Sequence, residues 1–316
     1  FGCEKEGGGG SDHLQLLTLK EILSKKAEPC YQSEVACLLY GDAFQLLKKI
    51  KTESIDMIFA DPPYFLSNGG ITCHSGKMVS VDKASWDKQE EMFGKQKEAF
   101  AKQEEVYGNQ KERKRKTDKK QKSSFLADRH RFNRRWIRLC RRVLKPDGTI
   151  WISGTMHNIY SIGMALEQEG FKIINNITWQ KTNPPPNISC RCFTHSTETI
   201  LWAKKDEPRA RHYFNYQKMK EENGGKQMKD VWTGGLTRAS EKKEGKHPTQ
   251  KPEYLLERIV SASTNEGEII LDPFCGSGTT GVAALRYDSR FIGIDQEETY
   301  LEISRRRLEK VRAEKR

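Results

Sequence analysis

The 316-residue sequence contains no apolar stretch that approaches the roughly 18 residues of a membrane-spanning helix. Its first residues, FGCEKEGGGGSDH, carry acids and glycines where a secretory signal would carry an apolar core. The eight cysteines are scattered along the chain, so reduced thiols are expected instead of a disulfide framework. We therefore expect a cytoplasmic protein without a membrane segment, in which residues 1–13 form a flexible N-terminal segment.

Two further absences exclude particular kinds of site. Cys190, Cys192 and His195 lie close together in the sequence, but a second pair of ligands is missing. We therefore favour plain loop residues over half of a zinc site, and we expect no metal site. The run GSGTT at residues 276–280 lacks the lysine with which a P-loop reaches phosphates, which argues against a P-loop enzyme.

Charge is unevenly distributed along the chain, whose formal net charge is +12. Residues 87–251 hold 36 lysines and arginines against 20 aspartates and glutamates, whereas the segments on either side are mildly acidic. A basic middle between acidic ends is typical of a protein that binds a polyanion. Charge that serves only solubility is the alternative.

Short β-rich runs alternate with helical patterns along most of the sequence. Strands are predicted at residues 35–40, 55–60, 149–153, 171–180, 199–203, 268–271 and 290–294. Helices are predicted near residues 44–50, 131–144, 158–169, 252–263 and 279–286, and from about residue 298. This alternation predicts an α/β fold with a doubly wound, mostly parallel sheet, in which ligands bind beyond the carboxyl ends of the strands.

One charged segment, residues 87–124, does not fit the alternation. Residues 88–108 repeat a seven-residue unit three times, as KQEEMFG, KQKEAFA and KQEEVYG, before a basic run. Favourable Glu-to-Lys pairs four residues apart support a helix, but glycines weaken it and the apolar residues do not follow coiled-coil spacing. We interpret residues 87–124 as an inserted, marginally helical excursion without a catalytic role. An arm that touches nucleic acid is the alternative.

The stretch DPPY, residues 61–64, directly follows the predicted strand at 55–60. Two prolines cannot continue a ladder or a helix, so the chain must leave the sheet here along a stiff path. A carboxylate and an aromatic residue held on such a path at a strand end indicate a site. The alternative is that Asp61 only caps a turn or a helix.

A second candidate site is the stretch DPFCGSGTT, residues 272–280. A strand ends at Asp272, a turn with Gly276 and Gly278 follows, a helix opens near Thr279, and the next strand ends at Asp295. Glycines allow close backbone approach, and an acid after the second strand can accept hydrogen bonds from ribose hydroxyls. The spacing therefore indicates a nucleotide-type cofactor.

Together, DPPY at 61, HPTQKP at 247 and DPFCGSGTT at 272 resemble the motifs of the DNA amino-methyltransferases, which use S-adenosylmethionine. Their order resembles the beta class of that family, and the resemblance runs from about Leu38 to Arg307. The stretches NPPPNISC, FTHSTETILWAKK and GKQMKDVWTGG further resemble the adenine methyltransferases of restriction systems that act at GATC, in particular the type that tolerates single strands.

The resemblance implies a Rossmann-like methyltransferase domain over residues 14–316, with S-adenosylmethionine as cofactor. It implies that Asp61, Pro62, Pro63 and Tyr64 are catalytic. Asp61 and the Pro62 carbonyl would accept the two hydrogens of the adenine N6 amine, and Tyr64 would face a base flipped out of the stack. The implied cofactor-binding residues are Asp42, Thr249, Lys251, Asp272, Phe274, Gly276, Gly278 and Asp295, with Lys251 paired to the cofactor carboxylate.

The implied partner is DNA, both duplex and single-stranded, and residues 181–246 are its expected recognition region because aromatic and basic residues alternate there. A homodimer, and a cognate restriction endonuclease that need not be bound, are also compatible with the resemblance. The alternatives are a cytosine-N4 methyltransferase, a catalytically silent nucleic-acid-binding protein, and an enzyme that acts on RNA. A covalent cytosine-C5 mechanism is disfavoured, since neither Cys30 nor Cys275 lies in a fitting target loop.

Overall fold

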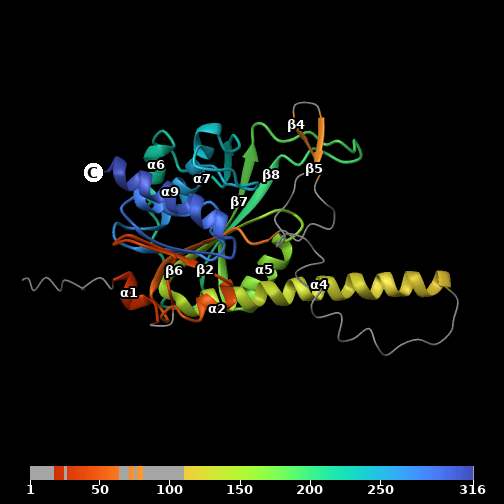
Figure 1. Ribbon diagram of the computed structural model, residues 1–316, viewed down its shortest axis with the longest axis horizontal. Coiled ribbons are helices and arrows are strands. Elements are labelled where there is room, and N and C mark those ends of the chain that lie inside the picture. Colours follow the sequence, from red (N-terminus) through yellow and green to blue (C-terminus); the bar gives the residue numbers. More distant parts are fainter. Residues whose placement is uncertain (1–17, 25–26, 64–70, 75–76, 81–109, 316) are drawn as a thin grey trace, which may run out of the picture.

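A computed structural model describes residues 18–24, 27–63, 71–74, 77–80 and 110–315 of the chain. Its main feature is a nine-stranded sheet with the order β1-β2-β11-β10-β3-β6-β8-β7-β9 (Figure 1). The strands are β1 (Tyr31–Gln32), β2 (Ala36–Tyr40), β3 (Ile55–Ala60), β6 (Leu144–Gly154), β7 (Phe171–Lys181), β8 (Thr197–Lys205), β9 (Val231–Gly234), β10 (Ile269–Asp272) and β11 (Arg290–Asp295). A separate hairpin pairs β4 (Ile71–His74) with β5 (Lys77–Ser80).

The five strands β2, β11, β10, β3 and β6 are parallel to one another, whereas β8 lies antiparallel to both β6 and β7. The predicted mostly parallel α/β sheet is therefore confirmed. Because strands in parallel register end at the same edge, the residues that follow β2, β3, β10 and β11 gather on one side of the sheet. Three of the predicted aspartates lie at this edge: Asp61 follows β3, and Asp272 and Asp295 end β10 and β11.

Helices cover both faces of the sheet. They are α1 (Leu19–Ile22), α2 (Ala43–Leu47), α4 (Gln110–Val143), α5 (Ile159–Gln168), α6 (Tyr216–Glu222), α7 (Glu253–Ser263), α8 (Thr279–Arg286) and α9 (Glu298–Glu314), with a short 3₁₀ turn at Ala239–Lys242. In Figure 1, α2, α4 and α5 lie below the sheet and α6, α7 and α9 above it. Each layer has its own apolar core.

The central strands are apolar on both faces because both faces are covered. In β3, Met57 and Phe59 pack toward the layer of α7, α8 and α9, whereas Ile58 and Ala60 pack toward α2, α4 and α5. The side chains of the neighbouring β6 also alternate between the two layers, and Trp151 packs toward α7, α8 and α9. This two-sided burial fixes the register of the strands, since a slip by one residue would exchange the two faces.

Most element boundaries agree with the sequence patterns to within a few residues, but α4 begins at Gln110, far upstream of the predicted start near Arg131. The end of segment 87–124 and the predicted helix that follows it therefore form one continuous helix, α4. Figure 1 shows α4 extending away from the rest of the chain. The KPDG stretch at 145–148 falls within β6, and the β3–β6 register jumps across it from Leu144 to Thr149. Tyr64, the repeats at 88–108 and residues 1–13 lie outside the described residues.

Among the helices of the described ranges, none is long and apolar enough to cross a membrane.

Helix α8 packs so closely on the sheet that one of its positions requires glycine. A Cβ atom on Gly281 would lie 2.5 Å from Cδ1 of Phe291 and 2.8 Å from Cδ2 of Leu308. The helical Gly163 of α5 has room instead, since its Cβ would lie 3.6 Å from Leu201.

We therefore expect Gly281→Ala to destabilise the protein by about 1–3 kcal/mol through overpacking. The matched change Gly163→Ala should be neutral or stabilise it by up to about 1 kcal/mol, because alanine is the better helix former. Urea unfolding of both variants measures the difference. Equal stabilities would contradict the close packing of α8 on β11.

Candidate active site

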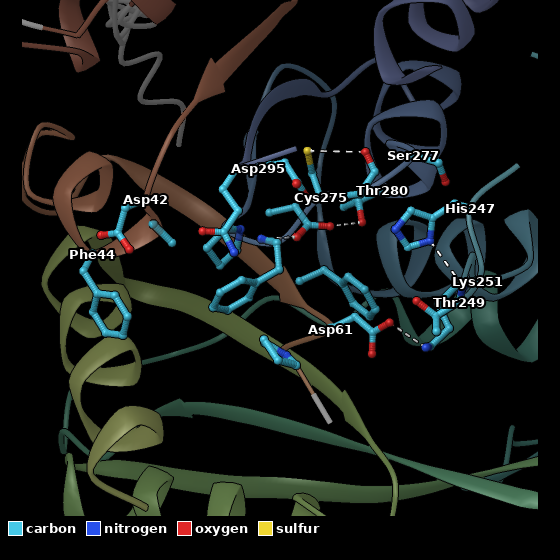
Figure 2. A pocket seen from close by; sticks show the side chains of 18 of the residues that line it. Asp42, Phe44, Asp61, His247, Thr249, Lys251, Cys275, Ser277, Thr280 and Asp295 are labelled. Carbon is cyan, nitrogen blue, oxygen red and sulfur yellow. Dashed lines mark hydrogen bonds and ion pairs between the residues drawn. The ribbon is translucent and has the colours of Figure 1, made fainter. Parts of the chain in front are cut away.

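A cavity of about 740 Å³ opens at the carboxyl edge of the sheet. Nine of the twelve predicted site residues line it: Asp42, Asp61, Pro63, Thr249, Lys251, Asp272, Phe274, Gly276 and Asp295. Pro62 and Gly278 belong to the same loops but do not line it, and Tyr64 lies outside the described residues. In Figure 2, Asp42 and Phe44 lie at one end of the cavity, Asp61 and Lys251 at the other, and Asp295 between them.

The floor of the cavity is the turn that follows β10. Asp272 is almost fully buried, and its carboxylate accepts hydrogen bonds from the Phe274 N–H at 3.0 Å and the Thr280 hydroxyl at 2.5 Å. These bonds join the end of β10 to the first turn of α8. Burial, with a smaller contribution from the nearby charges of Asp61 and Asp295, raises the pKa of Asp272 to about 7 despite both hydrogen bonds.

Both glycines of this turn have left-handed backbone conformations, with φ of 49° at Gly276 and 74° at Gly278. A Cβ on Gly276 would lie 2.8 Å from Nε2 of His247, and a Cβ on Gly278 would lie 2.6 Å from Oγ of Ser304. Gly276 faces the cavity, whereas Gly278 packs against α9. The prediction that these glycines shape the loop fits this geometry, but Gly278 acts from the side away from the cavity.

Side chains behind the loop hold it in place. Arg307 of α9 is buried and donates from one guanidinium nitrogen to the Ser277 carbonyl at 2.8 Å and to the Thr279 hydroxyl at 2.9 Å. Its other terminal nitrogen lies 2.7 Å from Glu253. The Ser304 hydroxyl donates to the Gly276 carbonyl at 2.8 Å. The loop conformation is therefore set by the fold itself.

Asp295 connects the loop to the next strand. Its carboxylate accepts from the Gly276 N–H at 2.8 Å and from the Glu297 N–H at 2.9 Å. Burial nevertheless raises the pKa of Asp295 to about 6. A carboxylate oxygen has more than one lone-pair site, so these oxygens can also accept from hydroxyl groups of a ligand.

The far end of the cavity is an aromatic wall that sequence reasoning missed. The rings of Phe44 from α2 and Phe132 from α4 meet edge to face, with centroids 5.2 Å apart, and the Arg135 guanidinium lies 4.7 Å above the Phe44 ring. Asp42 caps α2 by accepting from the Gln45 N–H at 3.0 Å. A flat heterocycle fits between such rings and a carboxylate. The separation of Phe44 and Phe132 in the sequence hid this pairing.

The HPTQKP stretch at 247–252 forms another side of the cavity. His247 is buried against Tyr300, and its Nδ1 accepts from the Thr249 N–H at 3.3 Å. Burial, together with the charges of Lys251, Arg307 and Lys242, lowers the pKa of His247 to about 4. The imidazole is therefore neutral near neutral pH and packs against the glycine loop without adding charge.

Asp61 and Lys251 meet at the near end of the cavity. The Lys251 ammonium lies 2.6 Å from Oδ2 of Asp61, and both side chains are largely buried (Figure 2). The same ammonium lies 3.4 Å from Glu198 on β8. Lys251 therefore contacts the predicted catalytic carboxylate, and its pairing with a cofactor carboxylate stays a prediction.

The proline loop is fixed by a network of buried amides that sequence reasoning also missed. Asn158, at the start of α5, donates to the Pro63 carbonyl at 3.1 Å. Its own carbonyl accepts from the Asn133 amide at 2.7 Å, and the Asn133 carbonyl accepts from the Trp136 indole at 3.2 Å. Because these groups are buried and paired, the orientation of the Pro63 peptide is determined by α4 and α5.

The fold and this cavity define a Rossmann-like enzyme that binds a nucleoside-containing cofactor. The cavity falls within the range of ordinary small-molecule sites, and its aromatic wall, acidic strand end and glycine turn suit a heterocycle, a ribose and a close backbone contact respectively. At the opposite end of the cavity, the Asp61 carboxylate and the proline loop can contact a reacting group of the substrate.

Comparison with known proteins identifies the family. A family model described as DNA methylase matches residues 55–306. The Type II methyltransferase M2.LlaDCHI of Lactococcus lactis subsp. cremoris is 61% identical over 90% of this chain and 93% of its own length. M2.DpnII of Streptococcus pneumoniae is 61% identical over 89% and 92%. M2.MboI of Moraxella bovis is 46% identical over 86% of both chains. The chain belongs to the DNA methylase family.

Solved structures agree with this assignment. The M1.HpyAVI complex with S-adenosylmethionine is 26% identical, covers 86% of this chain and 98% of its own, and has a TM-score of 0.55. The cytosine-N4-specific PvuII DNA methyltransferase covers 91% and 94% with a TM-score of 0.62, and at 16% identity it supports the fold alone. The predicted methyltransferase fold and S-adenosylmethionine as cofactor are thereby confirmed.

The raised pKa of Asp272 predicts how stability depends on pH. Its pKa is 3.8 when unperturbed and about 7 in the fold, so the unfolded chain loses this proton at lower pH than the folded chain. This contribution to stability is fully present below about pH 4 and is lost as the pH rises through about 7. We expect Asp272→Asn to show a smaller fall in melting temperature between pH 4 and 8 than the parent protein without cofactor.

Scanning calorimetry across this pH range measures the effect, because asparagine does not titrate: its oxygen can accept from the Phe274 N–H, and its NH2 group can donate to the Thr280 hydroxyl. The control is Asp288→Asn, which changes an exposed carboxylate on the surface. This control should follow the parent protein, and an identical pH dependence for Asp272→Asn would contradict the assignment.

The amide network predicts a rate effect without loss of cofactor binding. Asn158→Ala removes the donor to the Pro63 carbonyl and frees the proline loop to shift. Misplacement by about 1 Å can cost about 100-fold in rate, so we expect methyl transfer to slow by about 10- to 100-fold. The dissociation constant of S-adenosylmethionine should change by less than about 3-fold.

Single-turnover methylation and calorimetric titration test the two halves of this expectation, below the melting temperature of the variant. Asn223→Ala, which removes an exposed cap on α6, is the matched control. A parental rate in Asn158→Ala would show that the network has no part in positioning the loop.

Proposed function

We propose that this DNA methyltransferase transfers the methyl group of S-adenosylmethionine to N6 of adenine in GATC, on both duplex and single-stranded DNA, within a restriction-modification system. The observation that carries the chemistry is the stiff loop of Asp61 and its two prolines beside the cofactor cavity. When bound, the cofactor supplies an electrophilic methyl group on a sulfonium. The residues of this chain supply the acceptor geometry around the amine.

The amine is a poor nucleophile because its lone pair is delocalised into the ring. We assign the Asp61 carboxylate and the Pro62 carbonyl as acceptors of its two hydrogens, which favours a tetrahedral nitrogen with a lone pair available for attack. Asn158 already donates to the Pro63 carbonyl, which supports Pro62 as the acceptor that faces the base. Tyr64 stays the predicted stacking partner of the flipped base.

The target assignment is supported by the recognition-region stretches that resemble the GATC type, and by the Type II methyltransferases at 61% and 46% identity. Part of the predicted recognition region, residues 181–246, is β8 and belongs to the sheet. Trp232 is buried in the core, whereas Tyr213, Phe214 and Tyr216 are partly exposed. The Asn215 N–H, between these aromatics, donates to the Ala262 carbonyl near the C-terminal end of α7, at the edge of the sheet opposite Asp61, so we assign them no DNA contact. Localisation in the cytoplasm, a homodimer and a cognate endonuclease stay predictions.

Expression in a host that lacks adenine methylation, followed by sequencing of modified bases, tests the target. We expect N6-methyladenine confined to GATC, and transfer in vitro to GATC oligonucleotides in both duplex and single-stranded form, because an unpaired base costs less to unstack. Asp61→Ala serves as the inactive control, since it removes one acceptor of the amine and leaves the remainder of the cavity in place.

Each outcome separates a different part of the proposal. N6-methyladenine at another sequence would refute GATC and leave the chemistry intact. N4-methylcytosine would refute the base. No transfer to single-stranded GATC would restrict the enzyme to duplex DNA, and full activity of Asp61→Ala would refute the role of the carboxylate.

A further inference from the structure

Four charged side chains of alternating sign lie in a row from Asp61, in the cofactor cavity, to Lys181, at the end of β7. The Lys251 ammonium lies 2.6 Å from Asp61 and 3.4 Å from Glu198, and the Lys181 ammonium lies 2.6 Å from the other oxygen of Glu198. Lys181 also lies 5.2 Å above the Trp179 ring. The order of charges is therefore carboxylate, ammonium, carboxylate, ammonium, with a formal sum of zero.

Four separate elements bring these groups together. Asp61 follows β3, Lys251 precedes α7, Glu198 lies on β8 and Lys181 ends β7. The two last strands are paired neighbours, with Trp179 opposite Glu198. Since 190 positions separate Asp61 from Lys251, this arrangement is a product of the tertiary fold.

The four side chains are shielded from water. Their exposed fractions are 15% for Asp61, 7% for Lys251, 10% for Glu198 and 13% for Lys181. Burial alone would raise the pKa of Glu198, but the two lysines hold it below the ordinary value. Glu198 is therefore ionised near neutral pH, and an ion in such a site requires its partners.

We propose that Glu198 is a positioning residue for methyl transfer, which acts by holding the Lys251 ammonium in place against Asp61. Asp61 touches the substrate amine in the function proposed above, so this inference rests on that function. Lys251 fixes the carboxylate through a 2.6 Å contact, and Glu198 fixes Lys251 from the side away from the cavity. Neither Glu198 nor Lys181 lines the cofactor cavity.

Charge compensation is the second part of the role of Glu198. The methyl donor is a cation, and an uncompensated ammonium in a low-dielectric cavity would disfavour it. With Glu198 ionised, Lys251 has a carboxylate on either side, and the four charges of the row sum to zero. Replacing Glu198 by glutamine leaves the row with one excess positive charge next to the reaction.

The experiment compares Glu198→Gln with Glu207→Gln, whose parent carboxylate forms a partly exposed ion pair with Arg141. Transfer of a radiolabelled methyl group to DNA gives kcat, and calorimetry gives the dissociation constant of S-adenosylmethionine. We expect kcat of Glu198→Gln to fall by about 10- to 100-fold, with cofactor affinity weakened by no more than about 3-fold. Glu207→Gln should retain both parental values.

A double-mutant cycle shows whether Glu198 acts through Lys251. We expect Lys251→Met to slow transfer, and addition of Glu198→Gln to this background to slow it by less than about 2-fold more. Parental kcat in Glu198→Gln, or a full additional loss in the double variant, would overturn the proposal.

Glu198→Asp provides a second measurement if Glu198→Gln does not fold. Aspartate keeps the charge, but its side chain is one methylene shorter, so its carboxylate lies farther from Lys251. The kcat of Glu198→Asp should therefore lie below that of the parent protein and above that of Glu198→Gln where both variants fold. A parental rate in Glu198→Asp would overturn positioning through close contact. The radiolabel records transfer to either base, so an N4-methylcytosine product would refute the adenine assignment and leave this comparison valid.

Discussion

Three carboxylates converge in this protein because parallel strands end at one edge of a sheet. The register pairs Ile58 of β3 with Leu271 of β10, and Asp272 of β10 with Gly293 of β11. Asp61, Asp272 and Asp295 must therefore share one cavity. Since like charges in a buried space repel, each carboxylate needs compensation. Asp272 and Asp295 accept hydrogen bonds from backbone N–H groups, whereas Asp61 forms an ion pair with Lys251.

These two kinds of compensation distinguish binding from catalysis. An acceptor tied to backbone N–H groups is fixed by the loop, which suits Asp295 beside a ligand that binds and leaves. The position of a carboxylate that is held by a side chain depends also on the groups that this side chain contacts. Lys251, which holds Asp61, contacts Glu198. The proline loop adds a second constraint through Asn158, so α4, α5 and β8 all determine the geometry at Asp61.

The sequence predicted the sheet because its central strands are short apolar runs between recognisable helices. It predicted Asp61 and Asp295 because both follow such runs directly. It did not predict Glu198, which lies within a strand pattern, or the pairing of Phe44 with Phe132, because contacts between distant segments leave no local periodicity. The predicted start of α4 was wrong because the charged repeats obscured its boundary. Residues 145–148, between the predicted helix at 131–144 and the predicted strand at 149–153, belong to an irregular part of β6.

Helix α4 connects the charged segment to the chemistry. Its C-terminal half supplies Phe132 and Arg135 to the cavity wall and Asn133 to the amide network, while its N-terminal half lies within residues 87–124. One continuous helix therefore spans the segment interpreted as an insertion and the residues that orient the proline loop. A helix transmits a displacement along its axis more readily than a flexible linker, so the two parts are mechanically connected.

The buried carboxylates also explain why this cavity suits a cation. Burial raises the pKa of Asp272 to about 7 and that of Asp295 to about 6, which means that ionising these carboxylates in the fold without ligand costs stability. A cationic ligand that carries hydroxyl groups compensates such charges, and its binding free energy stabilises the folded state. The features that destabilise the protein alone are thus the ones that favour S-adenosylmethionine in the cavity, a trade-off that active sites commonly show.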